Sequence, residues 1–322
     1  MGQVTLTKEQ VYGSILGFIV GDALGVPVEF KEREWLMKNP VTDMIGFGTY
    51  NLPPGSWSDD SSLTFCLIDS LIHNYSNTDL SQRMIRWLKK GEWTPYGEAF
   101  DIGRTTEFAI RQLEQGVSPF KSGGKGEHDN GNGALMRILP LIFYLKGVPM
   151  EKRMEVANEV SQITHAHPRS LIANNIYIEL AILLLENKDK YDAYEEMKQI
   201  ILHLYTNTSF EVELKHFERI LKQDIHTFKL NDIRSTGYVV DTLEAVIWLF
   251  LNENSYNSTV LRAVNLGDDT DTIAAITGGL AGLYYGHESI NKNWINQLAR
   301  KEDIFDLIER FFLKLEIPSV KK

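Results

Sequence analysis

The hydrophobic residues of this chain recur mostly at intervals of three and four positions, the spacing of one face of an α-helix. Thr7 and Gln10 form a candidate capping box, which predicts a helix that runs toward Leu24. The same spacing predicts helices over residues 63–72, 80–88, 107–113, 154–163, 171–185, 193–204, 212–221, 239–251 and 304–315. The sequence shows no evenly spaced β-branched runs and no alternation of strand and helix patterns. The pattern therefore predicts an all-α fold.

Two stretches lack this periodicity. Residues 38–57 contain three prolines, and residues 118–133 contain five glycines. A conspicuous acidic or glycine motif directly follows each stretch, so neither has the character of an interdomain linker. We therefore expect one compact helical domain over residues 1–322, with its functional site on inserted loops.

The first predicted helix carries a stripe of glycines at positions 13, 17, 21 and 25. At 100° per residue this spacing keeps all four on one slowly drifting face. Each glycine costs about 1 kcal/mol relative to alanine inside a helix, so the stripe requires compensation. One interpretation is close helix–helix packing at the centre of a bundle. A second is that Gly21 and Gly25 also let the backbone approach a ligand.

Composition narrows the class of protein. Hydrophobic residues make up 43% and charged residues 24% of the 322 positions, as in a globular protein. Cys66 is the only cysteine, which excludes an intrachain disulfide and a four-cysteine zinc site. The formal net charge of −10 lacks the electrostatic footprint of a protein that binds nucleic acid or anionic membranes. We expect neither partner.

Membrane and export signals are weak. The longest uninterrupted run of apolar and small residues, 273–286, is too short and too rich in glycine to span a bilayer. Glu9 near the N-terminus and Asp22 after the first apolar stretch argue against a cleaved signal peptide. Together with the single cysteine, these features lead us to expect a cytoplasmic protein.

Two acidic clusters directly precede helical patterns. They are Ser58-Asp59-Asp60-Ser61 and Gly267-Asp268-Asp269-Thr270-Asp271-Thr272. Helix capping is one explanation, because Ser, Asp and Thr oxygens accept from free backbone N–H groups at helix starts. One cap needs only one oxygen, however, and these clusters supply five carboxylates. If the fold brings the clusters together, oxygen donors without His or Cys would suit Mg²⁺, Mn²⁺ or Ca²⁺.

Other candidate residues have ordinary structural explanations as well. Glu29 follows Pro27, which should end the first helix and leave the glutamate in a constrained loop. Asp101 could be an acidic residue in the N-terminal turn of a helix, and His165 could be a histidine at the C-terminal end of a helix, where the helix dipole favours each. The glycine-rich stretch 123–133 leads into a helical-looking segment at 134–137, an arrangement that can cradle a pyrophosphate. Tyr238 lies on a helical segment, where core packing is the default role of an aromatic side chain.

Taken together, these segments resemble the ADP-ribosylglycohydrolase family, all-α hydrolases that include dinitrogenase-reductase-activating and ADP-ribosylarginine hydrolase types. The matching segments, in family order, are Gly21-Asp22-Ala23-Leu24-Gly25 with Glu29, Trp57-Ser58-Asp59-Asp60-Ser61, Phe100-Asp101-Ile102-Gly103, Gly131-Asn132-Gly133-Ala134-Leu135-Met136-Arg137, Thr164-His165, Gly237-Tyr238-Val239-Val240-Asp241-Thr242-Leu243-Glu244-Ala245, and Gly267-Asp268-Asp269-Thr270-Asp271-Thr272. The resemblance implies an orthogonal multi-helix bundle around a central site for two Mg²⁺ or Mn²⁺ ions.

The resemblance also implies roles for individual residues. The metal ligands would be Ser58, Asp59, Asp60, Asp269, Asp271 and Thr272. Asp101 and Glu29 would be catalytic, and the substrate would bind at Gly131, Asn132, Gly133, Met136, His165 and Tyr238. Two positions depart from the family pattern: Ser58 stands where many members have threonine, and Arg104 stands where nitrogenase-related members often have asparagine.

The resemblance implies a monomeric, metal-dependent enzyme that removes ADP-ribose from a modified protein. The first expectation for the bond it cleaves is the N-glycosidic bond to arginine. Hydrolysis of O-linked ADP-ribose, on serine or as an acetyl ester, is one alternative. A relative that binds ADP-ribose without catalysis is another. The third is a class I terpenoid synthase, also all-α with two acidic clusters. That class places a carboxylate four residues after the first, where this chain has Leu63.

Overall fold

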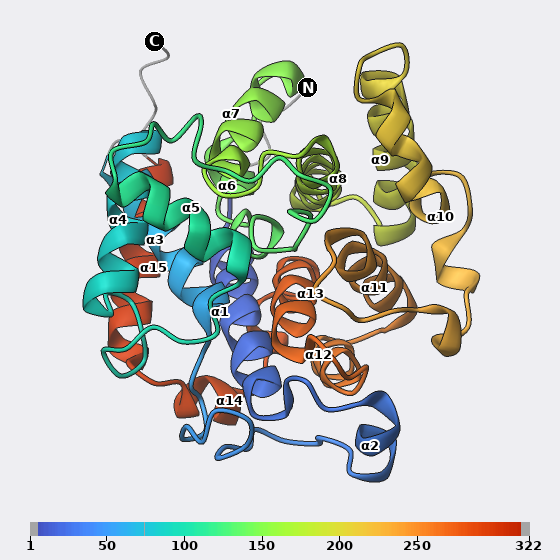
Figure 1. The fold of residues 1–322 in the computed structure, drawn as a ribbon. Coiled ribbons are helices and arrows are strands. Elements are labelled where there is room, and N and C mark those ends of the chain that lie inside the picture. The colour runs from blue at the N-terminus through green and yellow to red at the C-terminus, as the bar shows by residue number, and fades with distance from the viewer. Residues whose placement is uncertain (1–5, 74, 317–322) are drawn as a thin grey trace.

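The computed structural model describes residues 6–73 and 75–316, and the described residues contain helices but no β-strand (Figure 1). The helices are α1 (Lys8–Gly25), α2 (Arg33–Lys38), α3 (Asp59–Ile72), α4 (Asn77–Lys90), α5 (Arg104–Glu114), α6 (Leu141–Tyr144), α7 (Met150–Gln162), α8 (Pro168–Leu185), α9 (Lys190–Tyr205), α10 (Glu218–Leu221), α11 (Val239–Asn252), α12 (Tyr256–Val264), α13 (Thr270–Tyr285), α14 (Lys292–Gln297) and α15 (Lys301–Glu316). The predicted all-α fold is confirmed. The ends of the expected domain, residues 1–5 and 317–322, lie outside the described residues.

The helices cross at steep angles. In Figure 1, α8, α11 and α12 are seen nearly end-on, while α3 and α4 are seen from the side. The predicted capping box at Thr7 and Gln10 is present at the start of α1. The segment 212–221 was expected to be one helix but is a 3₁₀-helix, Glu211–Phe217, followed by the short α10. The periodicity also missed α2, α6 and α14, because one or two turns repeat a helical pattern too few times. It missed the nine-residue α12 as well.

Helix α1 packs antiparallel on α13 along the glycine stripe. A Cβ atom at Gly13 would overlap the Gly282 carbonyl oxygen, and one at Gly25 would overlap the Asp271 backbone. Between them, Gly17 faces Gly278 in the same way. The close-packing interpretation of the stripe is therefore correct. The idea that the stripe gives a ligand access to the backbone is wrong, because α13 occupies that space.

This antiparallel register has a functional consequence. The C-terminal end of α1 meets the N-terminal end of α13, so residues 21–29 lie against the beginning of the second acidic cluster. Pro27 lies in a 3₁₀ turn, Val26–Val28, which ends α1 as expected. The turn leads directly to Glu29, which is buried, with 4% of its surface exposed, and does not extend into solvent.

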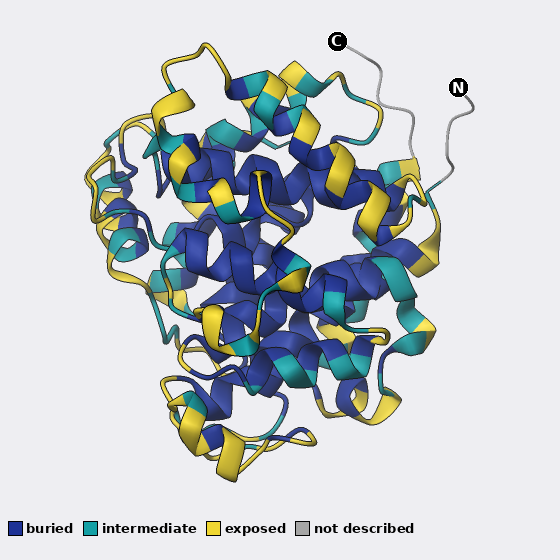
Figure 2. Cartoon of the chain, turned by 90° about the vertical axis from the view of Figure 1, so that its right-hand side faces the viewer, coloured by how far each residue is buried: buried dark blue, intermediate teal, exposed yellow. Residues whose placement is uncertain are grey.

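Most of the apolar surface of the long helices faces the interior, which is dark blue in Figure 2. Two helical stretches, Lys8–Val28 and Pro168–Leu185, are long and apolar enough to cross a membrane. In each, 94% of the apolar window is buried inside the protein, as in the core helices of a bundle.

Candidate active site

The two acidic clusters meet, although they lie at opposite ends of the sequence. Carboxylate oxygens of Asp60 in the first turn of α3, Asp271 in the first turn of α13 and Asp22 in α1 lie within 4.8 Å of one another. Thr272 Oγ1 also donates a hydrogen bond of 3.4 Å to Asp60 Oδ1, across 212 positions of sequence. The two helix starts therefore face each other.

A second group of carboxylates adjoins the first and shares Asp271 with it. Oxygens of Glu29, Asp101 and Asp271 also lie within 4.8 Å of one another. Asp101 has a left-handed backbone, with φ of 62°, a conformation that aspartate tolerates better than most residues. The conformation is strained and occurs here in a loop that holds the carboxylate next to Glu29.

Tyr50 links Glu29 and Asp101. Its hydroxyl lies 2.7 Å from Glu29 Oε2 and 2.5 Å from Asp101 Oδ1, and its ring packs on Phe100 with centroids 4.9 Å apart. A phenol has one proton and can donate only one of these bonds. The other bond therefore needs a proton on the second carboxyl group. The sequence interpretation missed Tyr50, because it lies in the irregular stretch 38–57.

Burial and mutual repulsion disfavour negative charge throughout the cluster. Burial, reinforced by the charge on Asp101, raises the pKa of Glu29 to about 10. Burial also raises the pKa of Asp269 to about 6. The pKa values of Asp60 and Asp271 are raised well above the ordinary range, by burial first and by neighbouring carboxylates second. Such a cluster is stable in its ionised form only with bound cations.

The carboxylates fit divalent cations better than they fit helix capping. Ser58 does cap α3, since its side chain accepts from the Asp60 N–H. By contrast, Asp269 at the N-cap of α13 makes no side-chain cap hydrogen bond. Among the residues that the structure describes, Asp60 Oδ2 and both carboxylate oxygens of Asp271 are buried without a hydrogen-bond partner. Buried, unpartnered hard oxygen atoms are the donors that Mg²⁺ and Mn²⁺ prefer.

Asp22 was not predicted as a site residue, although it lies in a matching motif. Its Oδ1 accepts from the Ser58 N–H at 2.9 Å, and its Oδ2 accepts from the Ser61 N–H and hydroxyl at 3.0 and 2.5 Å. These bonds fix the beginning of α3 against α1. The sequence signal that could have identified it is that Asp22 is the one charged residue within the apolar stretch 11–25.

The remaining predicted ligands lie around this centre. Asp59 is buried in the first turn of α3, and the charges of Asp101 and Asp22 add to burial in raising its pKa. Asp269 Oδ2 accepts a hydrogen bond of 2.6 Å from the Asn132 side chain. This bond connects the carboxylate cluster to the glycine-rich loop.

The predicted substrate-binding residues gather on that loop. Gly131 pairs with Tyr238 in an isolated antiparallel bridge, and a Cβ atom at Gly133 would lie 2.9 Å from His165 Cε1. One expectation was wrong: the loop leads not into an α-helix but into a single 3₁₀ turn, Leu135–Arg137. An anion here would be bound by loop N–H groups without the dipole of a long helix.

The side chains of His165, Tyr238 and Met136 have different surroundings. His165 is 2% exposed, and burial lowers its pKa to about 3, so the ring is neutral rather than a charged helix-end histidine. Its Nδ1 lies 2.8 Å from Thr164 Oγ1. The Tyr238 hydroxyl accepts from Arg169 at 3.1 Å, whereas the Met136 side chain belongs to the hydrophobic core.

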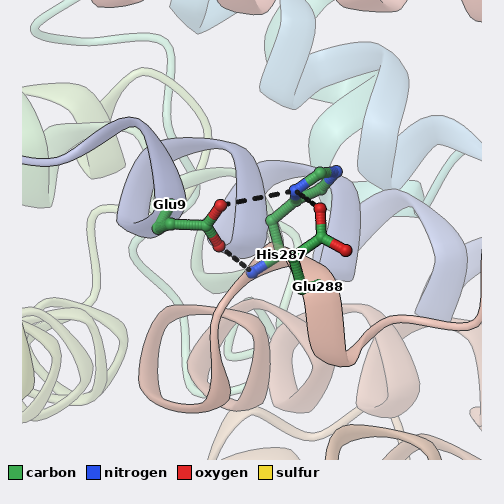
Figure 3. A group of neighbouring side chains, drawn as sticks. All are labelled: Glu9, His287 and Glu288. Atoms are coloured by element: carbon green, nitrogen blue, oxygen red, sulfur yellow. Dashed lines mark hydrogen bonds and ion pairs between the residues drawn. The ribbon is translucent and has the colours of Figure 1, made fainter.

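A third group of potential ligands lies elsewhere, at the N-terminal part of α1 and the end of α13. Figure 3 shows that the Glu9 carboxylate points toward His287 and Glu288. Glu9 accepts from the His287 N–H at 3.1 Å, and its side chain is 57% exposed. This contact connects the ends of two helices, and it has none of the burial found around Asp60 and Asp271.

Comparison with known proteins identifies the family of this chain. The family model for ADP-ribosylglycohydrolase matches residues 3–319. The chain is 34% identical to ADP-ribosylarginine hydrolase Tri1 of Serratia proteamaculans (94% of this chain, 79% of that one) and 29% identical to ADP-ribosyl-[dinitrogen reductase] glycohydrolase of Rhodospirillum rubrum (91% of each). A solved structure titled ADP-ribosylglycohydrolase-related protein complex superimposes with a TM-score of 0.80 at 27% identity, covering 95% of this chain and 98% of that one. The chain belongs to the ADP-ribosylglycohydrolase family.

Proposed function

We propose that this protein hydrolyses the bond between C1″ of ADP-ribose and an arginine guanidinium on a modified protein. The observation that carries the proposal is the meeting of Asp60, Asp271, Glu29 and the partly buried Asp101 in one cluster, in which three carboxylate oxygens have no hydrogen-bond partner among the described residues. Two relatives named ADP-ribosylarginine hydrolase, from Serratia proteamaculans and Pseudomonas putida, are 34% and 30% identical to the chain and support the arginine linkage. Family membership excludes the terpenoid synthase alternative.

Two Mg²⁺ or Mn²⁺ ions are the proposed cofactors. Their ligands would come from Ser58, Asp59, Asp60, Asp269, Asp271 and Thr272, with Glu29 and Asp101 beside them. When bound, such ions neutralise the carboxylates and orient hydroxyl groups of a sugar. Asp22, whose oxygens accept three hydrogen bonds from the start of α3, would position that helix start beside the ions.

Glu29, Tyr50 and Asp101 would manage the protons. Hydrolysis places a hydroxyl group on C1″ and a proton on the departing guanidinium nitrogen. One carboxylate must therefore take a proton from the attacking water, and one carboxyl group must donate a proton to the nitrogen. The Tyr50 hydroxyl lies between the two groups and orients both. The surrounding carboxylates would stabilise positive character that develops on the sugar.

The glycine-rich loop would bind the pyrophosphate. Gly131, Asn132 and Gly133 supply backbone N–H groups there, and the bond from Asn132 to Asp269 holds the loop against the cluster. His165 is packed against Gly133, and Tyr238 is paired with Gly131. Met136 would contribute by supporting the loop from the core.

The protein would act in the cytoplasm as a monomer with one domain over residues 1–322. Its buried, unpaired Cys66 is consistent with a reducing compartment. The proposed partner is an ADP-ribosylated protein, and neither nucleic acid nor membrane is proposed as a partner.

The test is incubation of the protein with Mg²⁺ or Mn²⁺ and defined conjugates of ADP-ribose on arginine, on serine and as an acetyl ester. We expect mass spectrometry to detect free ADP-ribose from the arginine conjugate. Asp101→Asn and Glu29→Gln should each lower turnover by about 10²–10⁴, the usual contribution of a positioned acid or base. Release from only the serine or acetyl conjugate would change the assigned linkage. Binding without release from any conjugate would identify a non-catalytic relative.

A further inference from the structure

Arg137 closes the 3₁₀ turn that follows the glycine-rich loop, and it is completely buried, with 0% of its surface exposed. Its Nη1 donates a hydrogen bond to the Gly133 carbonyl oxygen, and its Nη2 donates to the Val160 carbonyl oxygen at 3.1 Å. Its Nε has no hydrogen-bond partner among the residues that the structure describes. The guanidinium group therefore lies against the loop with one donor unused.

The partners of Arg137 differ from those of the other buried arginines in the described chain. Arg83 and Arg169 each form ion pairs with two carboxylates. Arg137 is more buried than either, yet both of its hydrogen bonds go to neutral carbonyl groups, and it forms no ion pair with a described residue. A buried charge without a counter-charge destabilises a fold, so packing alone does not account for this arginine.

The charge of Arg137 acts on both the loop and the carboxylate cluster. Burial lowers the pKa of Arg137 to about 10, so the group is still charged at neutral pH. Burial lowers the pKa of His165, which packs on Gly133, and the charge of Arg137 lowers that pKa further. The carboxylate of Asp59 in turn favours the charged form of Arg137. Arg137 is therefore a positive charge within electrostatic reach of the loop and of the cluster.

The bond from Arg137 to Gly133 also sets the direction of a backbone N–H group. In a trans peptide the C=O and N–H bonds point in opposite directions, and the described chain has no cis peptide. The Gly133 carbonyl oxygen points toward Arg137, so the Ala134 N–H of the same peptide points away from it. Among the described residues, neither this N–H nor that of Gly133 has an acceptor. Unbonded backbone N–H groups are uncommon in folded proteins, so this pair is available to an anion.

We propose that Arg137 is a positioning residue for the diphosphate group of the substrate, and that its buried charge holds this anion at the loop through the peptide between Gly133 and Ala134. The inference rests on the proposed function, which places the pyrophosphate at the glycine-rich loop. A hydrogen bond from a cation to the carbonyl end of a peptide polarises it and strengthens its N–H as a donor. The loop ends in a single 3₁₀ turn and lacks the dipole of a long helix. The guanidinium group supplies the positive potential that such a dipole would provide.

The test measures the affinity of the full chain for ADP-ribose, with Mn²⁺ present, by isothermal titration calorimetry. Arg137→Gln removes the charge but keeps a hydrogen-bond donor, and Arg137→Lys is the matched control that keeps the charge. We expect the Kd for ADP-ribose to rise roughly tenfold in the glutamine variant and less than about threefold in the lysine variant, because a charge acts over several ångströms in a low-dielectric interior. With ADP-ribosylarginine as substrate, KM should rise more than kcat falls, because the diphosphate is bound but not cleaved.

A second measurement, the affinity for Mn²⁺ alone, separates loss of charge from loss of structure. Removal of a positive charge near Asp59 should leave the Kd for Mn²⁺ unchanged or lower it, whereas a disturbed fold would raise it. Arg137→Met is a second neutral variant, in case the buried site does not accept the glutamine amide. Circular dichroism checks that the helices of each variant are retained.

The outcomes separate this inference from the proposed function. The role of Arg137 is overturned by unchanged affinity for ADP-ribose, by weaker binding of both ADP-ribose and Mn²⁺, by equal losses in the glutamine and lysine variants, or by neutral variants that do not fold. Each of these results leaves the proposed function intact if the wild type releases ADP-ribose from arginine. A wild type that binds ADP-ribose without releasing it from arginine overturns the function alone, and one that does not bind ADP-ribose overturns both.

Discussion

Asp60 at the beginning of α3 and Asp271 at the beginning of α13 place carboxylate oxygens within 4.8 Å of each other, and neither residue uses its carboxylate to cap its helix. Three of their four oxygens have no hydrogen-bond partner among the described residues. Two buried like charges at this separation destabilise the folded chain unless a cation lies between them.

Replacement of Asp271 by asparagine should separate metal binding from folding. In chelator-treated protein, we expect Asp271→Asn to unfold at a higher temperature than the wild type, because asparagine avoids the cost of burying or protonating this carboxylate. Added Mn²⁺ should stabilise the wild type by about 2.7 kcal/mol at one hundred times its Kd, and should have little effect on the variant. Thermal unfolding with and without Mn²⁺ measures both effects.

Asp268→Asn is the matched control for this experiment. It makes the same change in charge three positions away, at a residue outside both carboxylate groups. We expect this variant to retain the response of the wild type to Mn²⁺. An equal response of Asp271→Asn to the ion would contradict the metal site.

Tyr50→Phe should reduce both catalysis and stability. The phenol holds Glu29 and Asp101 in a fixed relation, and its loss leaves both carboxyl groups free to move. We expect kcat to fall at least roughly tenfold, with a loss of about 1–3 kcal/mol in the free energy of unfolding. Steady-state kinetics and urea denaturation measure the two effects. Unchanged kcat would show that the tyrosine does not position these residues.

Gly21→Ala should disrupt the contact between α1 and α13. The added Cβ atom would overlap the Ala274 backbone, which cannot move without shifting the beginning of α13. Overpacking of this kind costs about 1–3 kcal/mol or more. We also expect reduced activity, because Asp271 lies three residues before Ala274. Denaturant unfolding and turnover are the measurements.

The control for that variant is Gly103→Ala. A Cβ atom at Gly103 would meet nothing within 4 Å, and its backbone φ of −64° suits alanine. We expect a change of less than about 1 kcal/mol, the usual effect at an N-cap. Similar losses from both variants would mean that the glycine stripe is not specially packed.

Glu244 should make stability fall as pH rises. Burial raises its pKa from 4.5 to about 7, partly opposed by Arg219, whose Nη1 lies 3.2 Å from Oε2. Between these values the folded protein keeps a proton that the unfolded chain has lost. The stabilisation is therefore full below pH 4.5, is lost as pH rises through about 7, and changes no further above that.

Glu244→Gln cannot ionise, so its stability should decline less than that of the wild type between those pH values. Urea denaturation from pH 5 to 8 gives both curves, and their difference isolates Glu244. Glu302→Gln, at a side chain that is 86% exposed, should follow the wild type. Parallel curves for Glu244→Gln and the wild type would show that this carboxyl group does not titrate in the expected range.

The sequence determined the features that depend on neighbouring residues. Helical periodicity fixed the long helices, the Thr7–Gln10 box fixed the start of α1, and acidic helix starts marked Asp60 and Asp271 as candidates. These signals are local, because spacing and capping involve residues within one or two turns. Residues without such a signal, Tyr50 above all, were missed.

Only the tertiary structure decided which of these features meet. The antiparallel register of α1 on α13 is set by glycines that admit the facing backbone, and it brings residues 21–29 to the start of α13. The tertiary structure also showed that the Asp22 carboxylate is hydrogen-bonded to the start of α3, and that the glycine-rich loop ends in a 3₁₀ turn. Distances between segments depend on how complementary surfaces pack, and no spacing along a single chain encodes that directly.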